Sequence, residues 1–241
     1  MSNPDTYVML ISSLPRPEAL FISKRPPLSR LKLEQRLRML SPEDLEVIRL
    51  GEQVLSWAKL SAGDSDEQIV AQARAITEKI DNETVQLMIR DRLEIRTCVA
   101  ALRRRHRGQQ APPADSRWGF GRWVRHIARN WSDPAFRLDR VFPWLVEADR
   151  LLRSGETMKL QRLVLEQVWK AVNRYGAAHE FDFEAVCVYV LKWSIVDRWV
   201  RADAEAAVAR FEKLVQQGLG DFGGRFAGQG AANLETATSE R

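Results

Sequence analysis

The sequence predicts an all-α protein, and three observations lead to that prediction. Apolar residues recur at the three- and four-residue spacing of amphipathic helices through most of the 241 residues. Residues that start and stop helices bracket these runs at suitable distances. Hydrophobic residues make up 45% of the chain and charged residues 29%, the balance of a globular protein with a substantial core. We therefore expect a multi-helix, bundle-like body.

The opening stretch, YVMLISSLPRPEALFISKRPPLS (residues 7–29), does not fit this pattern. Its apolar run is far shorter than the roughly 20 residues that span a bilayer. Prolines at 15, 17, 26 and 27 interrupt the rest. Alternation over residues 8–13 favours a short extended N-terminal segment. We expect residues 7–14 to pack as a buried first element, and the next helix to begin near Ser29.

Three further helices are predicted in the N-terminal part, residues 1–107. Ser41 and Pro42 supply the N-cap and first residue of one, which breaks at Gly63. A second covers residues 66–79. A longer helix begins after Asn82 and ends in RRRHR before Gly108, because cations suit the last turn and glycine suits the C-terminal cap.

The remaining chain divides into three predicted parts. Residues 108–116 (GQQAPPADS) form a linker, since a proline pair and small polar residues break helices. A C-terminal helical block covers residues 117–217, with a central core helix in AVCVYVLKWSIVDRWV. The glycine-rich tail, residues 218–241, is expected to be disordered. Residues 7–217 are expected to form one integrated domain.

Familiar catalytic motifs are missing from the sequence. It contains no GxxxxGK[ST], HExxH or GxSxG motif, and GFGR at 119–122 is too short for a dinucleotide loop and lies in a predicted helix. Asp182 in HEFDFE is better explained as a helix N-cap than as a catalytic acid. Cys98 and Cys187 match no metal-ligand spacing and indicate a reducing compartment. We predict no enzymatic activity, no catalytic residue, no cofactor and no metal.

Positive charge is concentrated in one stretch of the chain. Residues 96–129 hold nine arginines and one acid, interleaved with four aromatic residues from Trp118 to Trp131. This pattern is typical of nucleic-acid binding, but Trp123, Ile127 and Trp131 also have the spacing of a buried helical stripe, which we favour. The residues predicted to bind a partner are Arg103, Arg104, Arg105, Arg107, Arg117, Arg122, Arg125 and Arg129.

Three stretches carry a family resemblance. They are YVMLISSLPRP…RPPLS with LSPEDLEVIRL, then CVAALRRRHRGQQ, and then the run from FPWLVEADRLLRSG to VLKWSIVDRWV. They are similar to a bacterial family of unassigned function whose genes lie among those of V/A-type rotary ATPases. Its genes occupy the position of the C subunit, the counterpart of eukaryotic subunit d. The resemblance covers most of residues 7–215.

The resemblance implies a non-catalytic central-stalk subunit, an all-α, funnel-shaped socket that couples the shaft to the membrane rotor ring. The ATPase would translocate protons or sodium ions. The implied partners are the rotor ring and the central shaft, and the implied localisation is cytoplasmic, peripheral to the inner membrane. Under this interpretation Arg103, Arg104, Arg105 and Arg107 face the ring or the shaft. Two alternatives stay open: a helical nucleic-acid-binding protein that uses residues 103–131, and a transient ATPase assembly factor.

Overall fold

The computed structural model describes residues 3–16, 19–55, 65–113 and 115–204. The chain divides into two compact units, Met1–Asp197 and Arg198–Arg241. The described residues of the second unit, 198–204, are helical. The described residues include many helices and no strand, which confirms the all-α prediction. The predicted disordered tail, residues 218–241, lies outside the described residues.

The first unit begins with helix α1 (Pro4–Ser13), so the prediction of an extended segment is wrong for these residues. Asn3 caps the helix by accepting a hydrogen bond of 3.2 Å from the Asp5 N–H, and Pro4 and Asp5 are both favoured in a first turn. Extended backbone starts only at Leu14, where ψ is 130°. The prediction that residues 7–14 are buried holds for one face only, which carries Tyr7, Leu10 and Leu14, whereas Val8 and Met9 on the other side are exposed.

Helices α2 (Arg30–Leu37), α3 (Pro42–Leu55), α4 (Asp66–Thr77) and α5 (Glu83–His106) begin at or next to the positions expected from the sequence. The predicted break at Gly63 lies outside the described residues. The predicted N-caps of α3 and α5, Ser41 and Asn82, each accept a hydrogen bond from the first turn of their helix. Ser29, near which α2 was expected to begin, caps that helix in the same way. Gly108 follows α5 with a φ of 75°, the left-handed conformation expected of a glycine at a helix C-terminus.

The second half of the unit contains α6 (Val124–Arg129), α7 (Trp144–Arg153) and α8 (Thr157–Gly176), and residues 183–197 form its last helix. The helix predicted from residue 117 is wrong in its first half, because residues 117–123 are not helical. Asp182 caps the last helix, as predicted, by accepting a 2.9 Å hydrogen bond from the Ala185 N–H.

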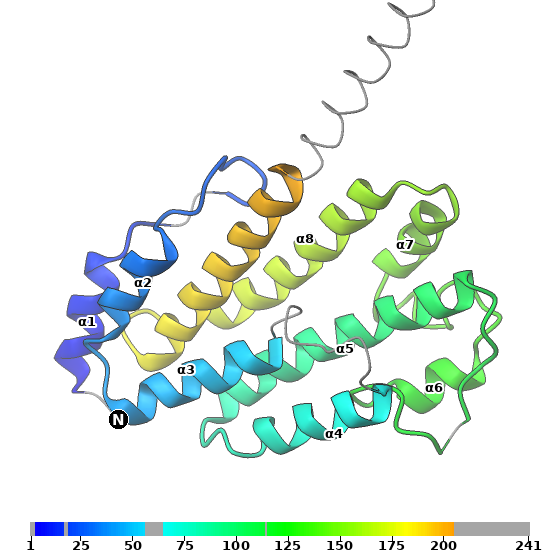
Figure 1. The fold of residues 1–241 in the computed structure, drawn as a ribbon, viewed down its shortest axis with the longest axis horizontal. Coiled ribbons are helices and arrows are strands. Elements are labelled where there is room, and N and C mark those ends of the chain that lie inside the picture. The colour runs from blue at the N-terminus through cyan, green and yellow to red at the C-terminus, as the bar shows by residue number, and fades with distance from the viewer. Residues whose placement is uncertain (1–2, 17–18, 56–64, 114, 205–241) are drawn as a thin grey trace, which may run out of the picture. The chain divides into compact units, whose positions relative to one another are not determined.

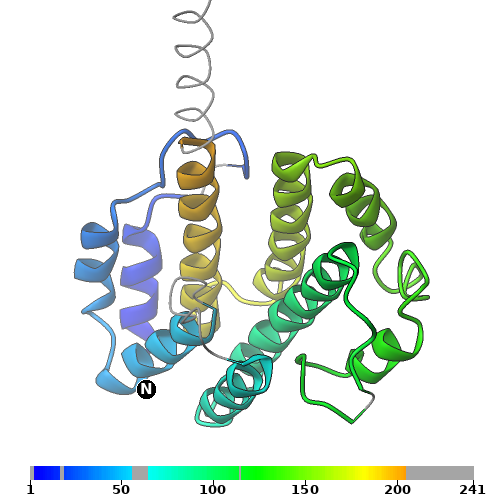
Figure 2. The ribbon, with the colours of Figure 1, turned by 45° about the vertical axis from the view of Figure 1, so that its right-hand side comes forward.

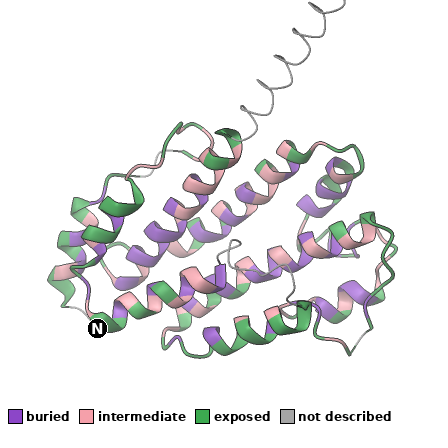
Figure 3. Ribbon diagram, in the orientation of Figure 1, coloured by how far each residue is buried: buried purple, intermediate pink, exposed green. Residues whose placement is uncertain are grey.

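Helix α5 is the centre of the packing. It contacts α3, α6, α7 and α8, and α7 and α8 also pack against each other (Figure 1). In two views residues 183–197 lie between the N-terminal helices and α8 (Figures 1 and 2). The buried residues line the facing sides of these helices (Figure 3). The predicted core helix is confirmed, since Val186 and Ile195 are fully buried.

Two long-range hydrogen bonds attach the proline-rich segment to this core helix. The Tyr189 hydroxyl donates to the carbonyl of Pro15 at 3.1 Å, and the Trp193 indole N–H donates to the carbonyl of Leu28 at 2.8 Å. The Tyr7 hydroxyl donates to a buried carboxylate oxygen of Asp44 on α3 at 2.7 Å. The opening segment is therefore bonded both to α3 and to the core helix.

Candidate anion-binding pocket and arginine surface

A cavity of about 750 Å³ lies between α4 and α5. The end of α3, which packs against both helices, closes one side, and residues 118–120 close another. We call this cavity the α4–α5 pocket. Apolar side chains make up much of its described lining, with Ile69, Val70 and Ile76 from α4, Leu93 and Val99 from α5, and Trp118 and Phe120 from the loop.

One wall of the α4–α5 pocket is strongly basic. Four pocket arginines, Arg96, Arg103, Arg104 and Arg107, come from α5 and from the residue that follows it. Their spacing of three, four and seven residues places them along one face of the helix. Asp66 on α4 is the one acid in the described lining. The described wall therefore carries an excess of positive charge.

Arg104 is held firmly within this wall. Its guanidinium donates to Asp66 at 2.7 Å and to the Gln109 side chain at 2.9 Å, and it lies 5.8 Å from the ring centre of Trp118. Asp66, the acid of the described lining, is therefore already paired with Arg104. Arg104 thus links α4, α5 and the loop rather than offering a free cation.

Arg103 and Arg107 have no such partner. Both are exposed, and neither makes a side-chain hydrogen bond or ion pair with a residue that the structure describes. Partial burial of the Arg103 side chain, together with the like charge of Arg107, lowers the pKa of Arg103 from its ordinary value. Burial also lowers the pKa of Arg96, and Asp66 opposes that shift. The wall is therefore a place where an added anion would relieve an electrostatic cost.

The loop wall of the pocket docks on α5 through its backbone. The Thr97 hydroxyl donates to the Phe120 carbonyl at 3.0 Å and accepts from the Phe120 N–H at 2.9 Å, and a Glu94 carboxylate oxygen accepts from the Arg122 N–H at 3.1 Å. Gly121 adopts a φ of 99° directly against Glu94. The GFGR motif is therefore a close-packed loop, not a helix and not a nucleotide-binding turn.

The Arg105 guanidinium makes its described contacts within the fold. Its guanidinium donates to the carbonyls of Trp131, Asp133 and Pro134 and to Asp149 on α7 at 2.7 Å. The Arg105–Asp149 pair is mostly buried, with side chains 14% and 11% exposed. The turn that Arg105 holds includes two non-glycine residues with positive φ, Phe136 and Arg137.

The other predicted arginines lie outside the pocket. Arg117, Arg125 and Arg129 are exposed and make no side-chain hydrogen bond or ion pair with a described residue, and we call them the outer arginines. Arg125 and Arg129 are four residues apart on α6 and so project from the same side. Arg122 is exposed but lies 3.7 Å from Glu94 and over the ring of Trp123.

The tryptophans of this region pack against protein aromatics rather than standing free. Trp118 is buried, and its ring meets Trp131 edge-on at 6.2 Å. Trp131 in turn packs 5.7 Å from Phe136, and Trp123 packs 6.3 Å from Phe142. Trp123 and Trp131 are only half-buried, so the predicted stripe is imperfect, although Ile127 between them is fully buried.

His179, Asp182 and Glu184 bring possible metal-ligand atoms within 4.8 Å of one another. Each of these side chains already has a partner in the protein. The His179 ring contacts Asp182 at 2.7 Å, and Glu184 accepts from the Asn82 side chain at 2.9 Å. These contacts cap the last helix and tie it to the start of α5, and they account for the cluster without an ion.

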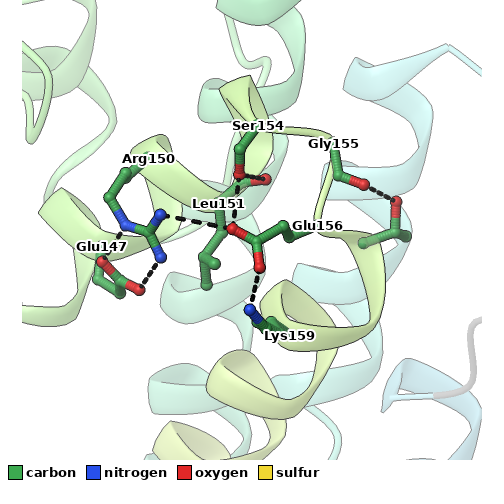
Figure 4. Close-up of polar contacts among 8 residues, drawn as sticks. Glu147, Arg150, Leu151, Ser154, Gly155, Glu156 and Lys159 are labelled. Carbon is green, nitrogen blue, oxygen red and sulfur yellow. Dashed lines mark hydrogen bonds and ion pairs between the residues drawn. The ribbon is translucent and has the colours of Figure 1, made fainter.

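A second polar cluster lies at the α7–α8 corner (Figure 4). Arg150 pairs with Glu147 at 2.7 Å and with Glu156 at 3.4 Å, and Glu156 also accepts from the Ser154 hydroxyl and pairs with Lys159. Bonding to Arg150 lowers the pKa of Glu147, and bonding to Lys159 lowers that of Glu156. Every charge here has an opposite partner, so the cluster fixes the corner and offers nothing to a ligand.

Sequence reasoning missed the pocket itself, including Arg96 and Asp66. The sequence did contain one indication of a basic wall, since Arg96, Arg103 and Arg107 share a helical face.

Comparison with protein-family models, with curated proteins and with solved structures finds no match for this chain. Among the residues described, none of the helices has the length and apolar character needed to cross a membrane.

Proposed function

We propose that this chain is a non-catalytic, partner-binding subunit of a V/A-type rotary ATPase, acting between the central shaft and the membrane rotor ring. The observation that carries the proposal is the outer arginines, three exposed guanidiniums without a described partner. Unpaired exposed arginines favour contact with an acidic surface. The resemblance of three stretches to the ATPase-associated family supplies the identity of that partner.

The packing of the first unit suits a part that transmits force. Aromatic rings connect Trp118 through Trp131 to Phe136, and Trp123 through Phe142 to Trp144. Such rings pack at specific angles and stiffen the core around them. A stalk subunit needs this stiffness, because torque passes through it as strain between packed helices.

The nucleic-acid alternative receives less support from the same region. Base stacking needs exposed aromatic faces, whereas Trp118 is buried and Trp123 and Trp131 lie against neighbouring rings. Phosphate contacts by the outer arginines alone would give binding that falls steeply with salt. Fluorescence anisotropy with labelled DNA and RNA at 50 and 200 mM salt separates the two proposals.

The direct test is co-purification of the tagged full chain with the shaft and ring subunits of the V/A-type ATPase from the same organism. The variant R117E/R125E/R129E should recover at least about tenfold less of these subunits, since three attractions become repulsions. The matched control, K24E/R25E/R38E, changes the charge equally at exposed cations that have no partner among the described residues, and it should behave as wild type.

Other results would contradict the proposal in identifiable ways. Recovery of no ATPase subunit by the wild-type chain overturns it. Recovery of subunits from partly assembled complexes only, and not from the active ATPase, would indicate an assembly factor instead. Equal recovery by the two triple variants would show that the outer arginines are not the contact surface.

A further inference from the structure

We propose that the α4–α5 pocket binds a small organic anion, a molecule with one phosphate or carboxylate group on an apolar body. This site is independent of the rotary ATPase. The first support is its size: about 750 Å³ lies within the range of cavities that take small organic ligands. An inorganic ion would fill a small fraction of that space.

The lining has an apolar part and a basic part, which match the apolar body and the anionic group of the proposed ligand. Ile69, Val70 and Ile76 of α4 lie across from Leu93 and Val99 of α5, and Phe120 adds an aromatic edge. Apolar surface on both sides favours a ligand with an apolar body. The pocket arginines lie toward the C-terminal end of α5, so the anionic group belongs at that end.

The charge balance at that end favours an anion even after Asp66 and the C-terminal carbonyls of α5 are counted. Asp66 neutralises Arg104, and the carbonyls at the end of α5 contribute about half a negative charge. Arg103 and Arg107 together exceed that contribution, and neither has a described acidic partner. A phosphate or carboxylate placed between them would gain two charge-assisted hydrogen-bonding partners.

The contacts of Arg104 preorganise part of the basic wall. Because Asp66, Gln109 and Trp118 hold its side chain, this part of the wall needs little reordering when a ligand enters. The loop that carries Trp118 is fixed in turn by the two hydrogen bonds between Thr97 and Phe120. Arg103 and Arg107 are held by no described hydrogen bond or ion pair, so their side chains are available to contact the anionic group.

The experiment is isothermal titration calorimetry of the full chain with four probes, each below its micelle-forming concentration. Octyl phosphate and octanoate carry both features of the proposed ligand. Octanol keeps the apolar body without the charge, and inorganic phosphate keeps the charge without the body. We expect at least one of the two octyl anions to bind at least tenfold more tightly than octanol and inorganic phosphate, and their order identifies the preferred head group.

Variants assign the binding to the pocket. R103Q/R107Q should weaken binding of the octyl anion at least tenfold and leave octanol unchanged. R125Q/R129Q is the matched control, because it removes another exposed arginine pair at the same four-residue spacing outside the pocket. Its affinity should equal that of wild type. A73F, on the α4 side of the lining, should block all the octyl probes, with thermal unfolding used to verify that each variant folds.

Absence of octyl anion binding to the wild-type chain overturns this proposal, as does binding that R103Q/R107Q leaves unchanged. Equal binding of octanol would reduce the site to an apolar cavity and also contradict it. Co-purification with the ATPase uses the outer arginines and no pocket residue, so either proposal can fail while the other stands.

Discussion

Arg103, Arg105 and Arg107 come from one short run, yet they have different roles. The guanidinium of Arg105 points into a cage of carbonyl oxygens and lies 4.4 Å from the ring centre of Phe136. Those of Arg103 and Arg107 lie on the pocket side. Two residues along a helix turn the side chain by about 200°, so Arg105 faces away from the side of α5 that carries Arg103 and Arg107.

The first prediction at this scale concerns Arg105. The substitution R105M should lower the free energy of unfolding by about 3–5 kcal/mol, because Asp149 would keep a buried charge with only Arg153 as partner. R107M, two residues away, should change it by less than about 0.5 kcal/mol. Urea unfolding followed by circular dichroism measures both, and equal midpoints would refute the structural role of Arg105.

The second prediction concerns the two thiols. Burial raises the pKa of Cys98 to about 12 and that of Cys187 well above its usual value, so the reactive thiolate is suppressed at neutral pH. Ellman's reagent at pH 8 should therefore label neither cysteine in the native protein and both in 6 M guanidinium chloride. Rapid labelling of the native protein would show that these side chains are accessible.

At the scale of elements, the loop at 119–121 requires its backbone to lie very close to α5. A Cβ on Gly121 would lie 2.3 Å from the Cγ of Glu94, and the φ of 99° is itself unfavourable for other residues. The Glu94 carboxylate is also the acceptor for the Arg122 N–H. A side chain at this position would therefore push the loop away from α5 and open the pocket wall.

We predict that G121A lowers the free energy of unfolding by about 2–4 kcal/mol, the sum of the left-handed backbone cost and overpacking. G155A is the matched control. Its φ of 73° is similar, but no atom lies within 4 Å of the added Cβ, so only the backbone cost of about 1–2 kcal/mol applies. Thermal unfolding compares the two, and equal losses would show that contact with Glu94 is unimportant.

Elements were predictable where the signal was local. The caps at Ser41 and Asn82 depend on a few neighbouring residues, and both were identified correctly, as was the start of α2 near Ser29. Helix α1 was missed because its apolar residues suggested alternation, although Asn3 and Pro4 carried a start signal. The loop at 117–123 was missed because Thr97 and Glu94, which hold it, lie more than twenty residues away in sequence.

At the scale of the first unit, the sequence located the basic region but did not show which of its arginines pair within the fold and which stay exposed. Which arginines pair internally depends on where Asp66, Glu94 and Asp149 arrive in space. Those positions follow from the packing of α4 and α7 against their neighbours, and no local pattern encodes them. The pocket could not be predicted for the same reason, since its walls come from four separate segments.

The hydrogen bonds from Tyr189 to Pro15 and from Trp193 to Leu28 join residues 174 and 165 positions apart. During synthesis, the N-terminal segment therefore leaves the ribosome long before its partner exists. At about 5–20 residues per second, that delay is about 8–35 s. Throughout it, Tyr7 of α1 lacks Phe183, the ring against which it packs in the folded protein. The nascent chain thus has a period in which a chaperone that binds apolar segments would find its first residues exposed.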